Sequence, residues 1–410
     1  MMSNLKGVVI SKGALGANTI SIGDNISGLI ISAPKPTGLE WDTPTTLYSV
    51  KDATKLGITE DNKQVNVLRH ITEFYRMAGE GTPLHLMLVA QNSKMPEVCE
   101  TKAKKLLVYA KGEIRQLAIA INSDSAEQYT MLNGLPQEVY NAIAKAQGLA
   151  EWAYNNFMPC QVLLEGYGYG GTASSTANLR ELPNLNATKV SVVIGQDYSY
   201  AKSKEGKAQK YADVGTVLGV CSKALVQQNI GNNELFNLTD ATQGVWIEPA
   251  LSSYTTIVDA FDDLQTLEDK GYIFGITYAG IAGVRINNDH TCTPVVVDSH
   301  HNMNEHSIAY GRIMDKASRG LRTAYLPKIK TDWELDEKGK MRPATVVALE
   351  DIGDSVLERM LANGEISYGK TTIDKDSDLV VEKVLKISFV VVPKGSIGEI
   401  KGTINLKTQA

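Results

Sequence analysis

The sequence predicts an α/β protein: a central α/β domain with a mostly parallel sheet, a C-terminal α+β domain, and extended strand arms at the N- and C-terminal ends. Between residues 40 and 290, short apolar runs alternate with helical segments, as in a parallel sheet covered on both faces. Beyond residue 300, two helical patterns precede strand patterns. Both ends carry strand-like segments that are too short to form a core alone.

Size and composition limit the possibilities. A chain of 410 residues with 43% hydrophobic residues predicts a folded protein of two or three domains. The net charge of −5, from 41 basic and 46 acidic side chains, argues against a direct nucleic-acid binder. The sequence contains no run of about 18 apolar residues, so no membrane span is predicted. The first residues lack a signal-peptide pattern. We therefore expect synthesis in the cytoplasm and no stable membrane insertion. The four cysteines are far apart, which predicts buried, reduced thiols.

The N-terminal segment, residues 1–30, is predicted to be an arm with the first strands. Two apolar stretches, "GVVI" (7–10) and "TISI" (19–22), are separated by a glycine-rich turn, and "ISGLIIS" (26–32) follows. Neither of the first two stretches can bury itself, so each needs another sheet.

The central domain is predicted over residues 31–298. Its continuous apolar runs predict buried strands, which are 84–90, 115–122, 160–166 and 189–196. The segments between them predict covering helices, which are about 63–77, 136–156 and 210–229. The polar, irregular stretch 288–306 is the expected domain boundary.

The C-terminal domain, residues 299–410, is predicted to open with a helix over about 304–325 that Pro327 stops. Ile313, Ala317 and Leu321 form part of its apolar stripe. Another face carries a basic stripe, which consists of Arg312, Lys316, Arg319 and Arg322. A second helix over about 346–362 closes with Asn363-Gly364, and a strand over 385–393 follows.

The last segment, "KGSIGEIKGTINLKTQA" (394–410), has the period of a half-buried strand. Ile400, Gly402, Ile404 and Leu406 alternate with polar residues. A terminal strand frays unless it is tied into a sheet, so the segment needs a partner strand.

Three polar clusters resemble sites but lack the required pattern, so no metal, cofactor or catalytic residue is predicted. The glycine cluster 166–176 has no phosphate-loop lysine. His290, His300, His301 and His306, with Cys292 and Asp298 nearby, fit no zinc spacing. The aspartate-rich segment 373–382 has leucine where a calcium loop needs glycine. We therefore expect a structural or interaction protein instead of an enzyme.

Several segments together resemble the sheath proteins of contractile phage tails and related contractile injection systems. The resemblance spans nearly the whole chain and depends on the order and spacing of many pieces. These pieces are "ISGLII" (26–31), "VVIGQD" (192–197), "ADVGTVLGVCSKALVQQNIG" (212–231), "KGYIFGITYAGIAGVRINND" (270–289), "RIMDKASRGLRTAYLPKI" (312–329), "ERMLANGEIS" (358–367) and "VPKGSIGEIKGTINL" (392–406).

The resemblance implies a subunit that polymerises into a helical sleeve around an inner tube and contracts to drive that tube through a target envelope. It implies that neighbouring copies exchange strands, and that the tube protein, the baseplate and tail terminator proteins are partners. The expected arm residues are Val8, Val9, Ile10, Ile20, Ile22, Ile397, Ile400, Ile404 and Leu406. The basic stripe is expected to face the tube. The particle could be a phage tail, a bacteriocin-like tail or a cellular injection device.

The alternative is a soluble α/β enzyme, such as a nucleotide-dependent oxidoreductase or hydrolase, with a site that no motif reveals. Assembly size separates the two hypotheses. A sheath subunit forms very large tubes or sheets, whereas an enzyme of this kind forms a small closed oligomer.

Overall fold

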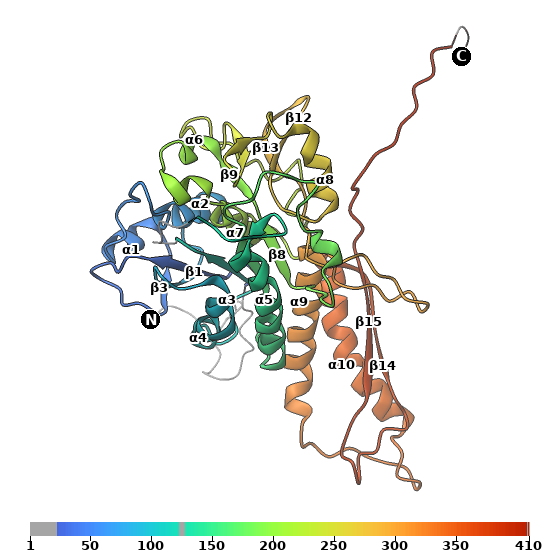
Figure 1. Ribbon diagram of the computed structural model, residues 1–410. Helices are drawn as coiled ribbons and strands as arrows, with labels where there is room; N and C mark the ends of the chain where they lie inside the picture. The colour runs from blue at the N-terminus through green and yellow to red at the C-terminus, as the bar shows by residue number, and fades with distance from the viewer. Residues whose placement is uncertain (1–22, 123–127, 408, 410) are drawn as a thin grey trace, which may run out of the picture.

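The computed structural model describes residues 23–122, 128–407 and 409. The predicted arm residues Val8, Val9, Ile10, Ile20 and Ile22 lie outside this part of the chain. Figure 1 shows a body of mixed helices and strands, a helical unit that extends from one side of this body, and a tail that leads away from both. The predicted fold class, with a parallel-rich central sheet and a C-terminal α+β region, is confirmed.

The central sheet has six strands in the order β2-β3-β1-β4-β7-β8. Neighbouring strands run parallel, except that β2 pairs antiparallel with β3. The strands are β1 (Ser27–Ala33), β2 (Thr45–Leu47), β3 (Leu84–Ala90), β4 (Gln116–Ala120), β7 (Gln161–Glu165) and β8 (Val190–Val193). Most of their residues are buried, which explains why they read as continuous apolar runs.

Helices cover both faces of this sheet. Leu29 and Ile31 of β1 belong to the core under α2 (Leu68–Ala78) and α7 (Val214–Lys223), whereas Ile30 belongs to the core on the opposite face. That second face is covered by α3 (Met95–Glu97), a π-helical turn at Val98–Lys102, α4 (Ala103–Tyr109) and α5 (Gln137–Asn155). The alternation of side chains along each strand therefore supplies two separate cores.

Smaller elements complete the body. They include a three-stranded antiparallel sheet, formed by β9 (Gly195–Asp197), β10 (Pro249–Leu251) and β11 (Thr255–Thr256). Two hairpins are β5 (Met131–Leu132) with β6 (Leu135–Pro136), and β12 (Gly275–Tyr278) with β13 (Ile281–Ile286). The short helices are α1 (Val50–Lys55), α6 (Tyr198–Ala201), α8 (Leu264–Asp269) and 3-10 turns at Leu179–Glu181, Gly206–Lys210, Phe261–Asp263 and Leu326–Lys328.

The C-terminal unit consists of two helices and a hairpin. The helices are α9 (Ile308–Tyr325) and α10 (Pro343–Ala362), and the antiparallel strands are β14 (Ile366–Ile373) and β15 (Ile387–Pro393). Its interior forms two small apolar cores, one around Leu357 and the other around Leu349. The tail, residues 394–407, has no regular secondary structure.

Several predicted boundaries shift for local reasons. The helix expected from residue 63 begins at Leu68, because the Asp61 carboxylate accepts hydrogen bonds from the backbone N–H groups of residues 67, 68 and 69. The helix expected to reach residue 229 ends at Lys223, because Ala224 is extended. The strand expected over 189–196 is divided between β8 and β9. Strand β14 was not predicted.

Candidate functional site: a groove beside a free strand edge

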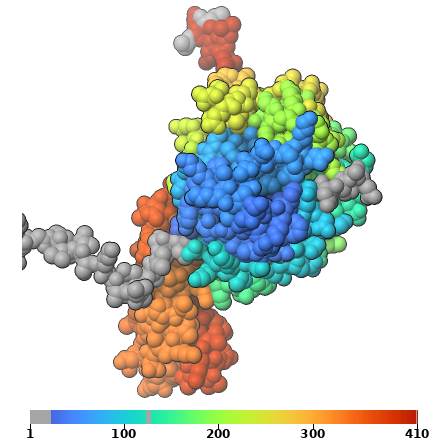
Figure 2. Space-filling model, turned by 90° about the vertical axis from the view of Figure 1, so that its left-hand side faces the viewer, coloured from blue at the N-terminus to red at the C-terminus, as the bar shows by residue number. Residues whose placement is uncertain are grey.

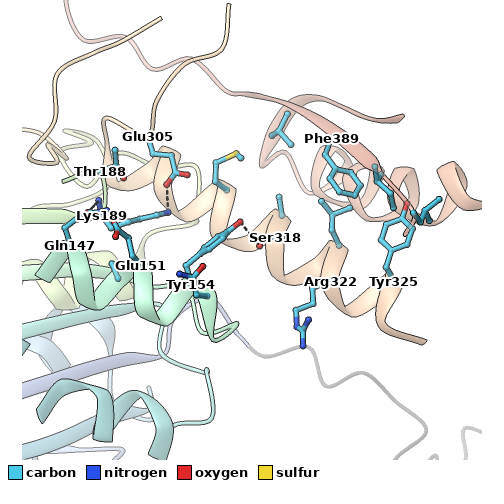
Figure 3. A pocket seen from close by; sticks show the side chains of 18 residues that line it. Gln147, Glu151, Tyr154, Thr188, Lys189, Glu305, Ser318, Arg322, Tyr325 and Phe389 are labelled. Carbon is cyan, nitrogen blue, oxygen red and sulfur yellow. Dashed lines mark hydrogen bonds and ion pairs between the residues drawn. The ribbon is translucent and has the colours of Figure 1, made fainter. Parts of the chain in front are cut away.

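A groove of about 900 Å³ lies between the central domain and the C-terminal unit, along α9. Figure 3 shows side chains of α5 on one side and Phe389 of β15 on the other, with α9 between them. The lining residues are Gln147, Ala150, Glu151, Tyr154, Asn155, Thr188, Lys189, Glu305, Met314, Ala317, Ser318, Leu321, Arg322, Tyr325, Leu385, Ile387, Phe389 and Val391. The groove is therefore built by segments that are far apart in the sequence.

Strand β15 supplies one apolar wall. Ile387, Phe389 and Val391 alternate along it, so their side chains share the face that lines the groove, and Leu385, just before the strand, lines it too. Among the described strands, β15 pairs only with β14, which leaves its second edge without a strand partner. An unpaired edge beside an apolar channel is a typical site for strand addition.

An ion-pair cluster closes one end of the groove. The Lys189 ammonium lies 2.7 Å from Oδ1 of Asp315 and also contacts Glu305, and the Gln161 amide donates to Oδ2 of Asp315 at 2.9 Å. Burial raises the pKa of Glu305, while the neighbouring Lys189 acts in the opposite direction. Because Lys189 precedes β8 and Asp315 lies on α9, the cluster fixes α9 against the central sheet.

The tail carries apolar side chains that nothing in the described chain covers. Ile397 is 82% exposed, Ile400 84%, Ile404 99% and Leu406 102%. Figures 1 and 2 show the tail leaving the body. The segment with the predicted strand pattern therefore pairs with no strand in the part of the chain that the structure describes.

The basic stripe, which was expected to face the tube, lies mostly inside the subunit. Arg312 is only 2% exposed and donates to the carbonyl oxygen of Ala224 at 3.0 Å. Lys316 and Arg319 pair with Asp24 at 2.6 and 3.3 Å. Only Arg322 is exposed, with its guanidinium 3.3 Å from the ring centroid of Phe157. Contact with a tube remains a prediction, and we retain it for Arg322 alone.

The polar clusters singled out in the sequence serve as local supports. His290 contacts Oε1 of Glu268 at 2.9 Å, whereas His300 and His301 are exposed. In the glycine cluster, Lys270 donates to the carbonyl oxygens of residues 173, 174 and 176. Within the described ranges, no group of three or more His, Cys, Asp or Glu residues could hold a metal ion.

The aspartate-rich segment and the cysteines have equally ordinary environments. Asp378 Oδ1 accepts hydrogen bonds from the backbone N–H groups of Val380 and Val381, both at 2.8 Å, which stabilises a turn. All four cysteines are buried and free, as predicted. In the part of the chain that the structure describes, no helix is both long and apolar enough to cross a membrane.

Two features of the site were missed at the sequence level. Strand β14 contains "ISYGKTTI", whose buried Ile366, Thr371 and Ile373 do not keep a strict alternation, because a bulge interrupts the ladder near Tyr368. Asp24 carries no local signal, because its partners lie almost three hundred residues away.

These features define the fold of a contractile sheath protein, and solved structures share it along the whole chain. A chain of the contracted helical sheath of the anti-feeding prophage is 14% identical, with 100% of both chains covered and a TM-score of 0.59. A chain in the baseplate of the same particle is 14% identical, with 99% and 100% covered and a TM-score of 0.62. A sheath tail protein from Desulfitobacterium hafniense is 10% identical, with 95% and 100% covered and a TM-score of 0.52.

The chain belongs to the DUF2586 family. The model of the family's N-terminal domain matches residues 5–290, and the model of its C-terminal domain matches residues 306–410. No curated protein matches the chain.

Proposed function

We propose that this protein is the structural subunit of a contractile sheath, which polymerises into a helical sleeve and contracts around an inner tube. The observation that carries the proposal is that one chain with a sheath-type fold carries two complementary surfaces. One surface is the groove beside the free edge of β15, and the other is the uncovered apolar tail.

In this proposal, the tail of one copy docks in the groove of another. Residues 400–406 match the length of β15, which has 7 residues and spans about 23 Å at roughly 3.3 Å per residue. A strand added at this edge turns alternate side chains toward the groove. Ile400, Ile404 and Leu406 then cover the apolar wall, and Gly402 lies between them.

The arrangement favours an open polymer over a closed oligomer. The tail runs away from its own β15 instead of folding back along it (Figure 1). Tail and groove are different surfaces, so the contact is head-to-tail, and a head-to-tail contact whose rotation does not close generates a helix. A continuous sleeve follows from repeating this contact.

The favourable contacts of a docked tail only slightly exceed the entropic cost of ordering it. About five ladder hydrogen bonds contribute roughly 0.5–1.5 kcal/mol each, and burial of three aliphatic side chains contributes roughly 1.5–3 kcal/mol each. Ordering the tail costs about 1–2 kcal/mol per residue. A single arm is therefore a weak link, and the sleeve is held by many such links while subunits re-orient.

The remaining parts of the proposal concern partners and contraction. The partners are further copies of the chain, an inner tube protein, the baseplate and terminator proteins, and Arg322 is the candidate tube contact. The extended sheath is a kinetically trapped state, and contraction is driven by the new contacts between subunits that form in the contracted sheath. The protein is made in the bacterial cytoplasm and functions in the tail of a particle. The match to sheath folds favours this function over the α/β enzyme alternative.

Intersubunit cross-linking tests the proposal. In the full chain, Ser388→Cys introduces a thiol on the exposed face of β15, and Thr403→Cys introduces a second thiol on the polar face of the tail. The four native cysteines are buried. Oxidation of concentrated protein should give a ladder of covalent multimers, with tubes visible by negative-stain electron microscopy. The matched control combines Lys375→Cys with Thr403→Cys. A small closed oligomer without a ladder, for Ser388→Cys and equally for Val390→Cys, would exclude tail docking at β15.

A further inference from the structure

Asp24 is bound by α9 at the point where residues 1–22 join the described body. Its Oδ2 atom lies 2.6 Å from the Lys316 ammonium, and its Oδ1 atom lies 3.3 Å from the Arg319 guanidinium. The carbonyl oxygen of Asp24 also accepts a hydrogen bond from Arg312 at 3.3 Å. Three members of the basic stripe therefore hold one residue, and β1 begins three residues later at Ser27.

Lys316 also reaches the docking hairpin. Its ammonium lies 2.6 Å from Oε1 of Glu365, the residue directly before β14, and the Glu365 side chain is only 10% exposed. A lysine ammonium has three donors, and here two of them join positions 24 and 365. The start of β1 and the start of the hairpin are thus linked by one side chain.

The charge balance makes Asp24 hard to replace. Arg115, Arg312 and Arg319 surround it together with Asp315, whose oxygens already accept from Lys189 and Gln161. Burial, and after it Arg319, lowers the pKa of Arg115 to about 10, while Asp24 acts in the opposite direction. Loss of the Asp24 carboxylate would remove one of the few anions that compensate these buried cations, which is destabilising.

We propose that Asp24, Lys316 and Glu365 form a coupler that fixes the hairpin that receives a neighbour's tail relative to the first strand of the central sheet. The inference rests on the proposed function. Force from a docked tail enters the subunit through β15 and β14. Lys316 joins the start of this hairpin to Asp24 beside β1, so the coupler sets the position of the receiving hairpin against the central sheet and thereby the spacing of successive copies in the sleeve. Its residues are positioning residues.

A triple-mutant analysis in the full chain tests this coupling. Asp24 and Glu365 form no hydrogen bond or ion pair with each other, but each contacts Lys316. If Lys316 couples them, the effects of Asp24→Asn and Glu365→Gln on the unfolding equilibrium constant should be non-additive by about threefold or more. The effects should become additive in a Lys316→Met background. Lys316→Arg should restore part of the coupling, because it keeps a cation with several donors.

Sleeve geometry provides the second measurement. We expect Glu365→Gln, the mildest change, to fold normally but to give sleeves of altered pitch or none. The matched control, Lys370→Met, breaks an exposed ion pair with Asp354 in the same unit and should leave the pitch unchanged. Additive effects with Lys316 present, or sleeves of wild-type pitch from both Glu365→Gln and Lys316→Met, would overturn the coupler. Absence of sleeves from the wild-type chain would instead contradict the proposed function, and the additivity test would still decide whether the coupling exists.

Discussion

Phe389 of β15 and Tyr325 of α9 lie with their ring centroids 6.0 Å apart, at an interplanar angle of 53°, and both side chains line the groove. The Tyr325 hydroxyl donates to the carbonyl oxygen of Leu349 at 2.8 Å. The aromatic pair therefore joins the hairpin, α9 and α10 at the floor of the docking surface (Figure 3). Phe389 is still 37% exposed, so part of its ring is available to an incoming strand.

Replacing Phe389 by alanine should affect both folding and docking. Because Phe389 is only partly buried, we expect a loss of about 1–2 kcal/mol in the free energy of unfolding, less than the roughly 3–5 kcal/mol typical of a fully buried phenylalanine. Tail docking should weaken more clearly, because the ring forms part of the groove wall. Urea unfolding measures the first effect and sedimentation of polymers measures the second. Wild-type polymer yield from Phe389→Ala would contradict the assigned docking face.

Charged substitutions in the tail should abolish assembly without changing the stability of the monomer. Ile404 and Leu406 are 99% and 102% exposed, so Ile404→Asp with Leu406→Asp removes no buried contact among residues 23–122 and 128–407. A buried carboxylate in the groove would be strongly unfavourable, and polymers should disappear. Val258→Asp, at a site 83% exposed on the central domain, is the control for surface charge. Equal loss of polymer from this control would point to a general charge effect instead of docking.

The sequence predicted several strands and helices around the central sheet well because each signal there was local. The run "LHLMLVA" coincides with β3, and the helical pattern over 136–156 differs from α5 by one residue at each end. These elements bury their side chains against neighbours on both faces, so periodicity alone identifies them. The alternation at residues 400–406 predicts a strand, and this remains a prediction, because the segment has no regular secondary structure and no strand partner among the described residues.

The site was harder to predict because it depends on distant contacts. Helical spacing placed Arg312, Lys316, Arg319 and Arg322 on one face, but it could not show that Asp24 and Glu365 would cover that face. Charged stripes on helices are usually solvated, and here long-range ion pairs bury most of the stripe. The groove depends likewise on the placement of α5 and β15 on either side of α9, which no local pattern encodes.

Two glycines in helices should respond in opposite ways to alanine. A Cβ atom at Gly215 of α7 would lie 2.4 Å from the backbone oxygen of His70 on α2. Gly215→Ala should therefore force the two helices apart and destabilise the fold by about 1–3 kcal/mol. A Cβ atom at Gly148 of α5 would have no neighbouring atom within 4 Å. Gly148→Ala should therefore stabilise the fold by roughly 0.5–1 kcal/mol through helix propensity. Thermal unfolding of both variants checks the pair, and equal shifts would contradict the close contact of α2 with α7.

Glu165, at the end of β7, should make stability fall as the pH rises. Burial raises the pKa of Glu165 to about 8, although the backbone N–H groups of Ile121 and Ala212 donate to its carboxyl and act in the opposite direction. The unfolded chain loses this proton near the ordinary value of 4.5, whereas the folded chain keeps it up to about pH 8. Its contribution is therefore full below pH 4.5, falls by about 1.4 kcal/mol per pH unit across this window, and is constant above it.

The variant Glu165→Gln isolates this effect, because a neutral amide cannot titrate. Urea unfolding of both proteins between pH 5 and pH 8 should show the variant gaining stability relative to the wild type as the pH increases. The difference between the two proteins removes the contributions of other buried acids, such as Asp197 and Asp289, whose pKa values are also raised by burial. Glu399→Gln in the exposed tail is the control and should follow the wild type. Parallel pH profiles for Glu165→Gln and the wild type would mean that the Glu165 carboxyl ionises in the folded protein near its ordinary pKa.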